Sequence, residues 1–129
     1  MLDFDDLMGC PFKIHGRNRN GFDCYGLVIE VERRLGHDMT DYYGEYTNTD
    51  CEKVVNDNCD DFVAKMNMTE TDTPQLGDVI VFMNEEGCSV HVGVYLKKDD
   101  FIHCDNGGVA VENLKYYFRQ NRKVYTWQK

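Results

Sequence analysis

The stretch GFDCYGLV, residues 21–28, places a cysteine directly after an aspartate, where an apolar helical pattern begins. Apolar residues recur at steps of three and four, which predicts an amphipathic helix: Cys24, Leu27, Val28, Val31 and Leu35. We expect Asp23 to be its N-cap and Gly36 to follow its last turn. A cysteine in the first turn lies at the positive end of the helix dipole, which favours the thiolate. Cys24 is therefore a candidate nucleophile, with an inert core residue and a metal ligand as the alternatives.

Length and charge limit the class of protein. A chain of 129 residues with 42% hydrophobic residues predicts one globular domain. No apolar run approaches 18 residues, and the net charge of −9 disfavours a nucleic-acid backbone, so neither membrane nor nucleic acid is an expected partner. The start, MLDFDDLMGC, has acidic residues where a signal peptide has basic ones, which predicts a chain made and kept in the cytoplasm. The six cysteines are then expected to be reduced thiols.

Further along, the pattern changes from helical to extended. A short helix is expected over residues 3–8, and a second over 51–66, opened by the capping box Thr49-x-x-Glu52. After Pro74 come short runs rich in β-branched and aromatic residues: DVIVFM, VHVGVYL, DFIHC, GVAVEN and KVYTW. Helices followed by strands predict an α+β fold with a mostly antiparallel sheet. Residues 111–118 fit either a helix or a loop.

Two histidines fall in adjacent predicted strands. LKKDD, residues 96–100, is the expected hairpin turn between them, so His91 and His103 could be neighbours. One histidine could take the thiol proton of Cys24, and the other could orient the first ring. The alternative is a zinc site made from Cys88-x-x-His91 and His103-Cys104. Because adjacent residues of a strand point to opposite faces, Cys104 and His103 could not easily bind one ion, and no metal or cofactor is expected.

Three separate segments resemble the NlpC-type papain-like cysteine peptidases. They are GCPFKIHGRNRNGFDCYGLV, PQLGDVIVF and HVGVYLKKDDFIHCDNGGVAVENL, and they occur in the family's order. The resemblance implies a papain-like α+β fold, with N-terminal helices packed on a mostly antiparallel sheet of about five or six strands. It implies a single domain over residues 1–129 with a helical insertion at about 38–73. It also implies Cys24 as nucleophile, His91 as general base and His103 as the orienting group.

The same resemblance implies a substrate. Members of the family hydrolyse peptide bonds in the stem peptides of bacterial peptidoglycan, commonly next to γ-linked D-glutamate. DCYGLVIEVERRLGHDMTDY, residues 23–42, is similar to the subgroup found in phage and prophage tails. Phage tail proteins are then expected partners, and the virion tail is an expected location.

The substrate pocket is where this chain departs from the family. Phe12 stands where the family often has a tyrosine, and Tyr25 where it often has a serine. Asp23 matches an aspartate that binds a free peptide amine in cell-wall recycling members. A basic loop before the cysteine is expected to attract substrate carboxylates through Lys13, Arg17 or Arg19. The departures keep two alternatives open: a weak or inactive tail assembly or binding module, and a thiol acyltransferase or amidase acting on a small molecule.

Overall fold

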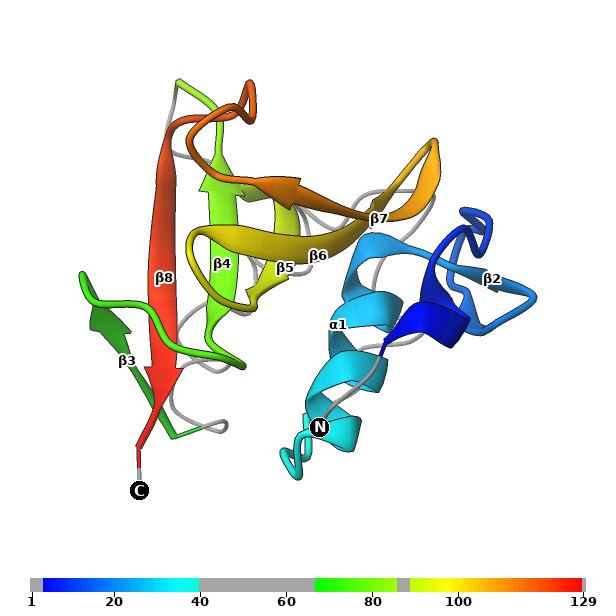
Figure 1. The fold of residues 1–129 in the computed structure, drawn as a ribbon, viewed down its shortest axis with the longest axis horizontal. Helices are drawn as coiled ribbons and strands as arrows, with labels where there is room; N and C mark the ends of the chain where they lie inside the picture. The colour runs from blue at the N-terminus through cyan, green and yellow to red at the C-terminus, as the bar shows by residue number, and fades with distance from the viewer. Residues whose placement is uncertain (1–3, 40–66, 86–88, 129) are drawn as a thin grey trace.

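The computed structural model describes residues 4–39, 67–85 and 89–128 as one helix and two β-sheets (Figure 1). The elements in chain order are the 3-10 turn η1 (Asp5–Leu7), β1 (Arg17–Asn18), β2 (Gly21–Phe22), α1 (Cys24–Arg34), β3 (Met68–Thr71), β4 (Val79–Met83), β5 (Ser89–Tyr95), β6 (Asp100–Asp105), β7 (Gly108–Asn113) and β8 (Arg122–Trp127). Six strands form an antiparallel sheet in the order β3-β8-β4-β5-β6-β7, while β1 and β2 pair separately. The predicted α+β, papain-like class is confirmed.

Helix α1 begins and ends where the sequence predicts. The Asp23 carboxylate accepts the backbone N–H of Gly26 at 2.6 Å, which caps the first turn. Gly36 has a φ of +91°, the left-handed conformation that ends a helix and favours glycine. Between these ends the buried face of α1 packs on β5 and β6. The cysteine at its first position is thereby fixed against the sheet.

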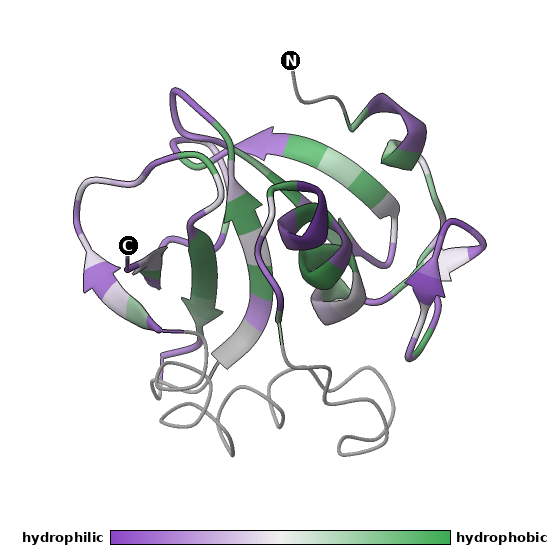
Figure 2. Cartoon of the chain, turned by 90° about the horizontal axis from the view of Figure 1, so that it is seen from below, coloured by the Kyte–Doolittle hydropathy of each residue, from purple (hydrophilic) through white to green (hydrophobic). Residues whose placement is uncertain are grey.

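The central strands are buried on both faces. In β4, Val79 and Val81 face the core shared with α1, whereas Ile80 and Phe82 face a second cluster on the other side of the sheet. Figure 2 shows hydrophobic residues along the central strands and on part of α1, and hydrophilic residues in the connecting loops and on the rest of α1. The β6–β7 hairpin curves across the sheet toward α1 and β2 (Figure 1). Strand β6 contacts α1, and the thiol of Cys104 in β6 donates to the backbone oxygen of Phe22 just before the helix.

Several expectations require correction. The helix expected over residues 3–8 is only the three-residue turn η1. A helix over 111–118 is wrong, because β7 extends to Asn113 and turns follow it. The helix expected over 51–66 lies outside the described residues. Within the expected insertion, β3 is a strand that pairs with β8, and its polar sequence MTET gave little sign of it.

Among the residues described, no helix has the length and hydrophobicity needed to span a membrane.

Candidate active site

Cys24 is held at the start of α1 by the loop that precedes it. The residue is only 4% exposed. A Cβ added to Gly26 would lie 2.0 Å from the backbone oxygen of Gly16, so this glycine permits the loop to cross the helix start. The Asp23 carboxylate, itself fully buried, also accepts a hydrogen bond from Arg17 at 3.0 Å. The loop and the helix start are therefore joined by a buried ion pair beside Cys24.

The oxidation state of Cys24 differs from that of the other described cysteines, Cys10 and Cys104. Cys24 is disulfide-bonded, whereas Cys10 and Cys104 are free. The expectation of reduced thiols thus holds for two of these three cysteines and is wrong for Cys24. Burial raises the pKa of Cys104 to about 12, and its thiol donates to the backbone oxygen of Phe22 at 3.2 Å, so Cys104 is inert. Any nucleophilic chemistry belongs to the reduced form of Cys24.

His91 and His103 form a hydrogen-bonded chain that continues to a third residue. His91 Nε2 lies 2.7 Å from His103 Nδ1, and His103 Nε2 lies 2.5 Å from Glu112 Oε2. Both histidines are buried, while the Glu112 side chain is 43% exposed. Glu112 was not predicted from the sequence. This hydrogen-bond chain runs from the partly exposed Glu112 inward to His91. The other ring nitrogen of His91, Nδ1, faces neither His103 nor Glu112.

Strand register explains this geometry. In the β6–β7 hairpin His103 pairs with Ala110 and Phe101 pairs with Glu112, so Glu112 is a diagonal neighbour of His103 on the same face. Between β5 and β6, a Cβ on Gly93 would lie 3.3 Å from His103 Cβ and 3.1 Å from Phe101 Cδ2. The glycine therefore leaves room for the side chains of His103 and Phe101. Pairing the residues on either side of the DNGG turn, residues 105–108, would have placed Glu112 close to His103.

The hydrogen-bond chain sets the proton positions. A carboxylate can only accept, so Glu112 places the His103 proton on Nε2 and leaves Nδ1 as an acceptor. His103 Nδ1 then accepts from His91 Nε2, which leaves a lone pair on His91 Nδ1. Burial, with smaller contributions from the charges of His103 and Arg119, lowers the pKa of His91 to about 3. His91 is therefore neutral near pH 7, and its Nδ1 lone pair is the group that could accept a thiol proton.

Cys24 and His91 line the same small pocket. Its volume is about 150 Å³, and the residues around it are Phe12, Cys24, His91, Cys104, Asp105, Asn106 and Arg119. Of the predicted substrate-binding residues, only Phe12 lies here. Its ring offers no hydrogen-bond donor, so the pocket lacks the hydroxyl that a tyrosine would supply.

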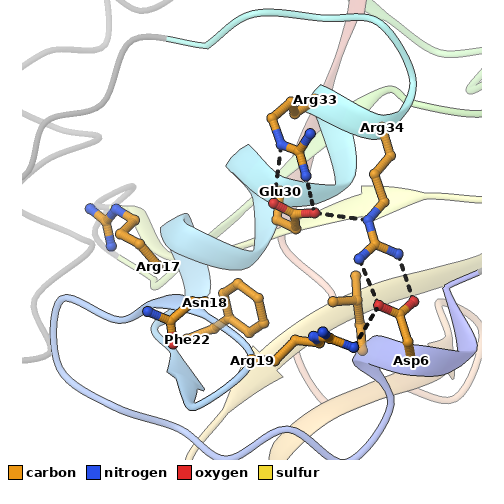
Figure 3. Close-up of a pocket in the computed structure, with 9 residues that line it drawn as sticks. Asp6, Arg17, Asn18, Arg19, Phe22, Glu30, Arg33 and Arg34 are labelled. Carbon is orange, nitrogen blue, oxygen red and sulfur yellow. Dashed lines mark hydrogen bonds and ion pairs between the residues drawn. The ribbon is translucent and has the colours of Figure 1, made fainter.

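The other predicted substrate-binding residues lie elsewhere. Tyr25 is 1% exposed in the core, and Asp23 is committed to Gly26 and Arg17. Arg17 and Arg19 line a different surface hollow between η1, β1 and α1 (Figure 3). There Arg19 pairs with Asp6 at 3.7 Å, while Arg17 points away from that cluster. The structure therefore does not bring these four side chains to the Cys24 pocket.

Three side chains near the site could offer ligands to a cation. Single ligand atoms of His103, Asp105 and Glu112 lie within 4.8 Å of one another. His103 and Glu112 already hydrogen-bond to each other, and Asp105 Oδ1 accepts the N–H of Gly107 at 2.9 Å. In the zinc alternative, Cys104 lies in the α1 core while His103 packs against Phe101 on the opposite face. Cys88, its fourth ligand, lies outside the described residues.

The chain has recognisable relatives. The sequence pattern of the NlpC/P60 family matches residues 9–128. A curated relative, the "Probable peptidoglycan endopeptidase LytE" of Bacillus subtilis (strain 168), is 25% identical over 115 residues, covering 87% of this chain and 28% of the relative. This chain therefore spans under a third of that protein's length.

Solved structures share the fold. The NlpC/p60 domain of the peptidoglycan hydrolase SagA is 19% identical, with a TM-score of 0.61 over 96% of this chain and 92% of that one. NlpC2 from Trichomonas vaginalis is 22% identical, with a TM-score of 0.63 over 97% of this chain and 44% of that one. At these identities the matches establish a common fold.

Proposed function

Because the chain belongs to the NlpC/P60 family, we propose that it is a cysteine peptidase that hydrolyses peptide bonds in bacterial peptidoglycan. The observation that carries the proposal is the pocket that Cys24 shares with His91, with His103 and Glu112 hydrogen-bonded behind it. A cysteine at a helix start, a base and an orienting group are the parts that thiol acyl transfer needs. The Bacillus subtilis relative is named a probable peptidoglycan endopeptidase, which supports peptidoglycan as the proposed substrate.

The first half of the reaction forms a thioester. His91 Nδ1 takes the proton of the reduced Cys24 thiol, and the sulfur attacks the carbonyl carbon of the substrate. Backbone N–H groups at the start of α1, including that of Cys24, are the expected donors to the oxyanion. The proton on His91 then passes to the leaving nitrogen, the C–N bond breaks, and the new amine departs.

The second half restores the enzyme. A water gives its proton to His91 Nδ1 as its oxygen attacks the thioester carbon. The C–S bond breaks, the carboxylic acid product leaves, and the proton returns to the Cys24 sulfur. Through both halves the hydrogen bonds from His91 to His103 and from His103 to Glu112 hold the His91 ring in one orientation.

The finer part of the proposal concerns the bond and the setting. We place the scissile bond after a γ-linked D-glutamate and before a diamino acid, following the family resemblance. We further propose that the chain, after synthesis in a bacterial cytoplasm, functions among the tail proteins of a virion; the similarity of residues 23–42 to phage tail members supports this.

The test is hydrolysis of purified muropeptides by the reduced protein. Mass spectrometry of the products should show new amine ends, and the fragment masses identify the bond that was cut. Cys24→Ser should abolish this activity. Cys10→Ser is the matched control, since Cys10 is a free cysteine that does not line the pocket. If the reduced wild-type protein generates no new amines, the peptidase proposal is wrong.

A binding module without activity is the second candidate. Phe12 favours it, because this pocket residue supplies no hydroxyl where the family often has one. A pH profile of thiol alkylation separates the two. An activated Cys24 should react well below the ordinary thiol pKa of about 8.5, whereas a retired one should follow it.

A further inference from the structure

The Cys24 pocket contains one cation that the preceding sections leave without a role. Arg119 lies in the loop between β7 and β8 and lines the pocket together with Cys24 and His91. The basic residues predicted from the sequence, Arg17 and Arg19, line a different hollow. A positive side chain beside the reacting groups of a chain with a net charge of −9 calls for an explanation.

The guanidinium of Arg119 is held in place by its own loop. Its Nη1 donates to the hydroxyl of Tyr117 at 3.0 Å, and its Cζ lies 4.6 Å from the centre of the Phe118 ring. Tyr117 is buried and packs edge-on against His103, with ring centres 5.3 Å apart. The loop therefore fixes Arg119 relative to the histidine chain, which reduces the entropy lost when a ligand binds.

Arg119 also retains its charge for a ligand. Within residues 4–39, 67–85 and 89–128 it forms no ion pair with a carboxylate, in contrast to Arg17, Arg33 and Arg34. Asp105 lines the same pocket without forming an ion pair with Arg119, and it accepts the Gly107 N–H instead. A planar guanidinium with its remaining N–H groups available matches a carboxylate in a two-bond geometry.

We infer that Arg119 binds a carboxylate of the substrate on the acyl side of the scissile bond. The inference rests on the proposed function, because γ-linkage of a glutamate leaves its α-carboxylate free on the acyl side, separated by the Cα, Cβ and Cγ carbons from the carbonyl that is attacked. Arg119 is then a specificity-determining residue that distinguishes a free carboxylate from an amide at this position. An amide carries no charge and replaces one acceptor oxygen with a donor, so it loses both the ion pair and one hydrogen bond.

Binding and turnover are measured separately with two synthetic tripeptides, L-alanyl-γ-D-glutamyl-diamino acid with the α-carboxyl group either free or amidated. Calorimetry in a Cys24→Ala background, which cannot turn over, gives both dissociation constants. The acid should bind about tenfold or more tightly than the amide. Arg119→Met should bring this ratio close to one by weakening the acid, and Arg119→Lys should keep only part of it. Arg122→Met is the matched control, because Arg122 is also without an ion pair among the described residues but does not line the pocket.

The outcomes separate the two proposals. Equal binding of acid and amide, no binding of either, or a ratio that survives Arg119→Met in a folded protein would overturn the inference about Arg119. If the reduced wild-type protein cleaves the tripeptides while Arg119→Met leaves the selectivity unchanged, the peptidase proposal stands and this inference fails. If acid and amide are distinguished through Arg119 but neither is cleaved, the inference stands and the peptidase proposal fails.

Discussion

Replacing Glu112 by glutamine tests the hydrogen-bond chain that runs from His91 through His103 to Glu112. The carboxylate can only accept from His103 Nε2, so it allows one proton arrangement along the chain. A glutamine amide can also donate to His103 Nε2. The whole chain could then reverse, which would place a proton on His91 Nδ1 and block its action as a base. The substitution also removes the negative charge that stabilises a protonated histidine pair.

The size of the effect follows from the exposure of Glu112. A hydrogen bond to a charged group contributes about 1.5–3 kcal/mol. The Glu112 side chain is 43% exposed, so solvent screens this interaction and the lower end applies. A loss of about 1.4 kcal/mol in the transition state corresponds to roughly a tenfold fall in kcat/KM. Glu112 acts through His103 and is therefore a positioning residue.

The assay compares kcat/KM on a muropeptide for the reduced wild type, Glu112→Gln and Glu70→Gln. Glu70 is the matched control, because it is an exposed glutamate on β3, at the opposite edge of the sheet from β7. Glu112→Gln should also move the alkylation pH profile of Cys24 upward, which a purely structural change would not do. If Glu112→Gln matches Glu70→Gln within twofold in both measurements, the assignment of Glu112 is refuted.

Three further substitutions test other parts of the structure. Phe12→Tyr places a hydroxyl in the Cys24 pocket and should raise kcat about tenfold or more if it reaches the oxyanion; an unchanged kcat with an unchanged melting temperature would count against this role. Gly26→Ala should lower the free energy of unfolding in urea by about 2 kcal/mol, because the added Cβ would lie 2.0 Å from the Gly16 oxygen. This clash outweighs the gain of up to about 1 kcal/mol in helix propensity. Burial raises the pKa of Glu32 from 4.5 to about 8. The folded chain therefore keeps a proton that the unfolded chain loses above pH 4.5, and the free energy of unfolding falls as pH rises toward 8. Glu32→Gln should therefore gain stability relative to wild type across this window and hold a constant difference above pH 8; a difference independent of pH would contradict the buried, protonated state of Glu32.

Local sequence was sufficient to predict the helix that carries Cys24. Asp23 caps α1, Gly36 ends it, and the apolar spacing of its residues identifies the buried face. These signals act within a few residues of one another, so they are present in the sequence itself. The strands of the sheet were found in the same way, apart from the polar strand β3 and the two-residue strands β1 and β2.

The pocket could not be predicted in the same way, because its members come from distant segments. Arg17 was expected to contact substrate but pairs with the buried Asp23. Tyr25 follows Cys24 in the sequence, yet it is buried in the core. Arg119 lines the pocket from a loop in which Tyr117 packs against His103. Such placements depend on how the loops fold over the sheet, which residue spacing does not specify.

The sequence by itself determined a helix-start cysteine, two histidines in neighbouring strands and the family to which the chain belongs. Tertiary structure decided the order of hydrogen bonds from His91 through His103 to Glu112 and the choice of Arg119 as the cation in the pocket. The physical reason is register and packing. A slip of one residue between β6 and β7 would turn Glu112 to the opposite face, so its role exists only in the paired sheet.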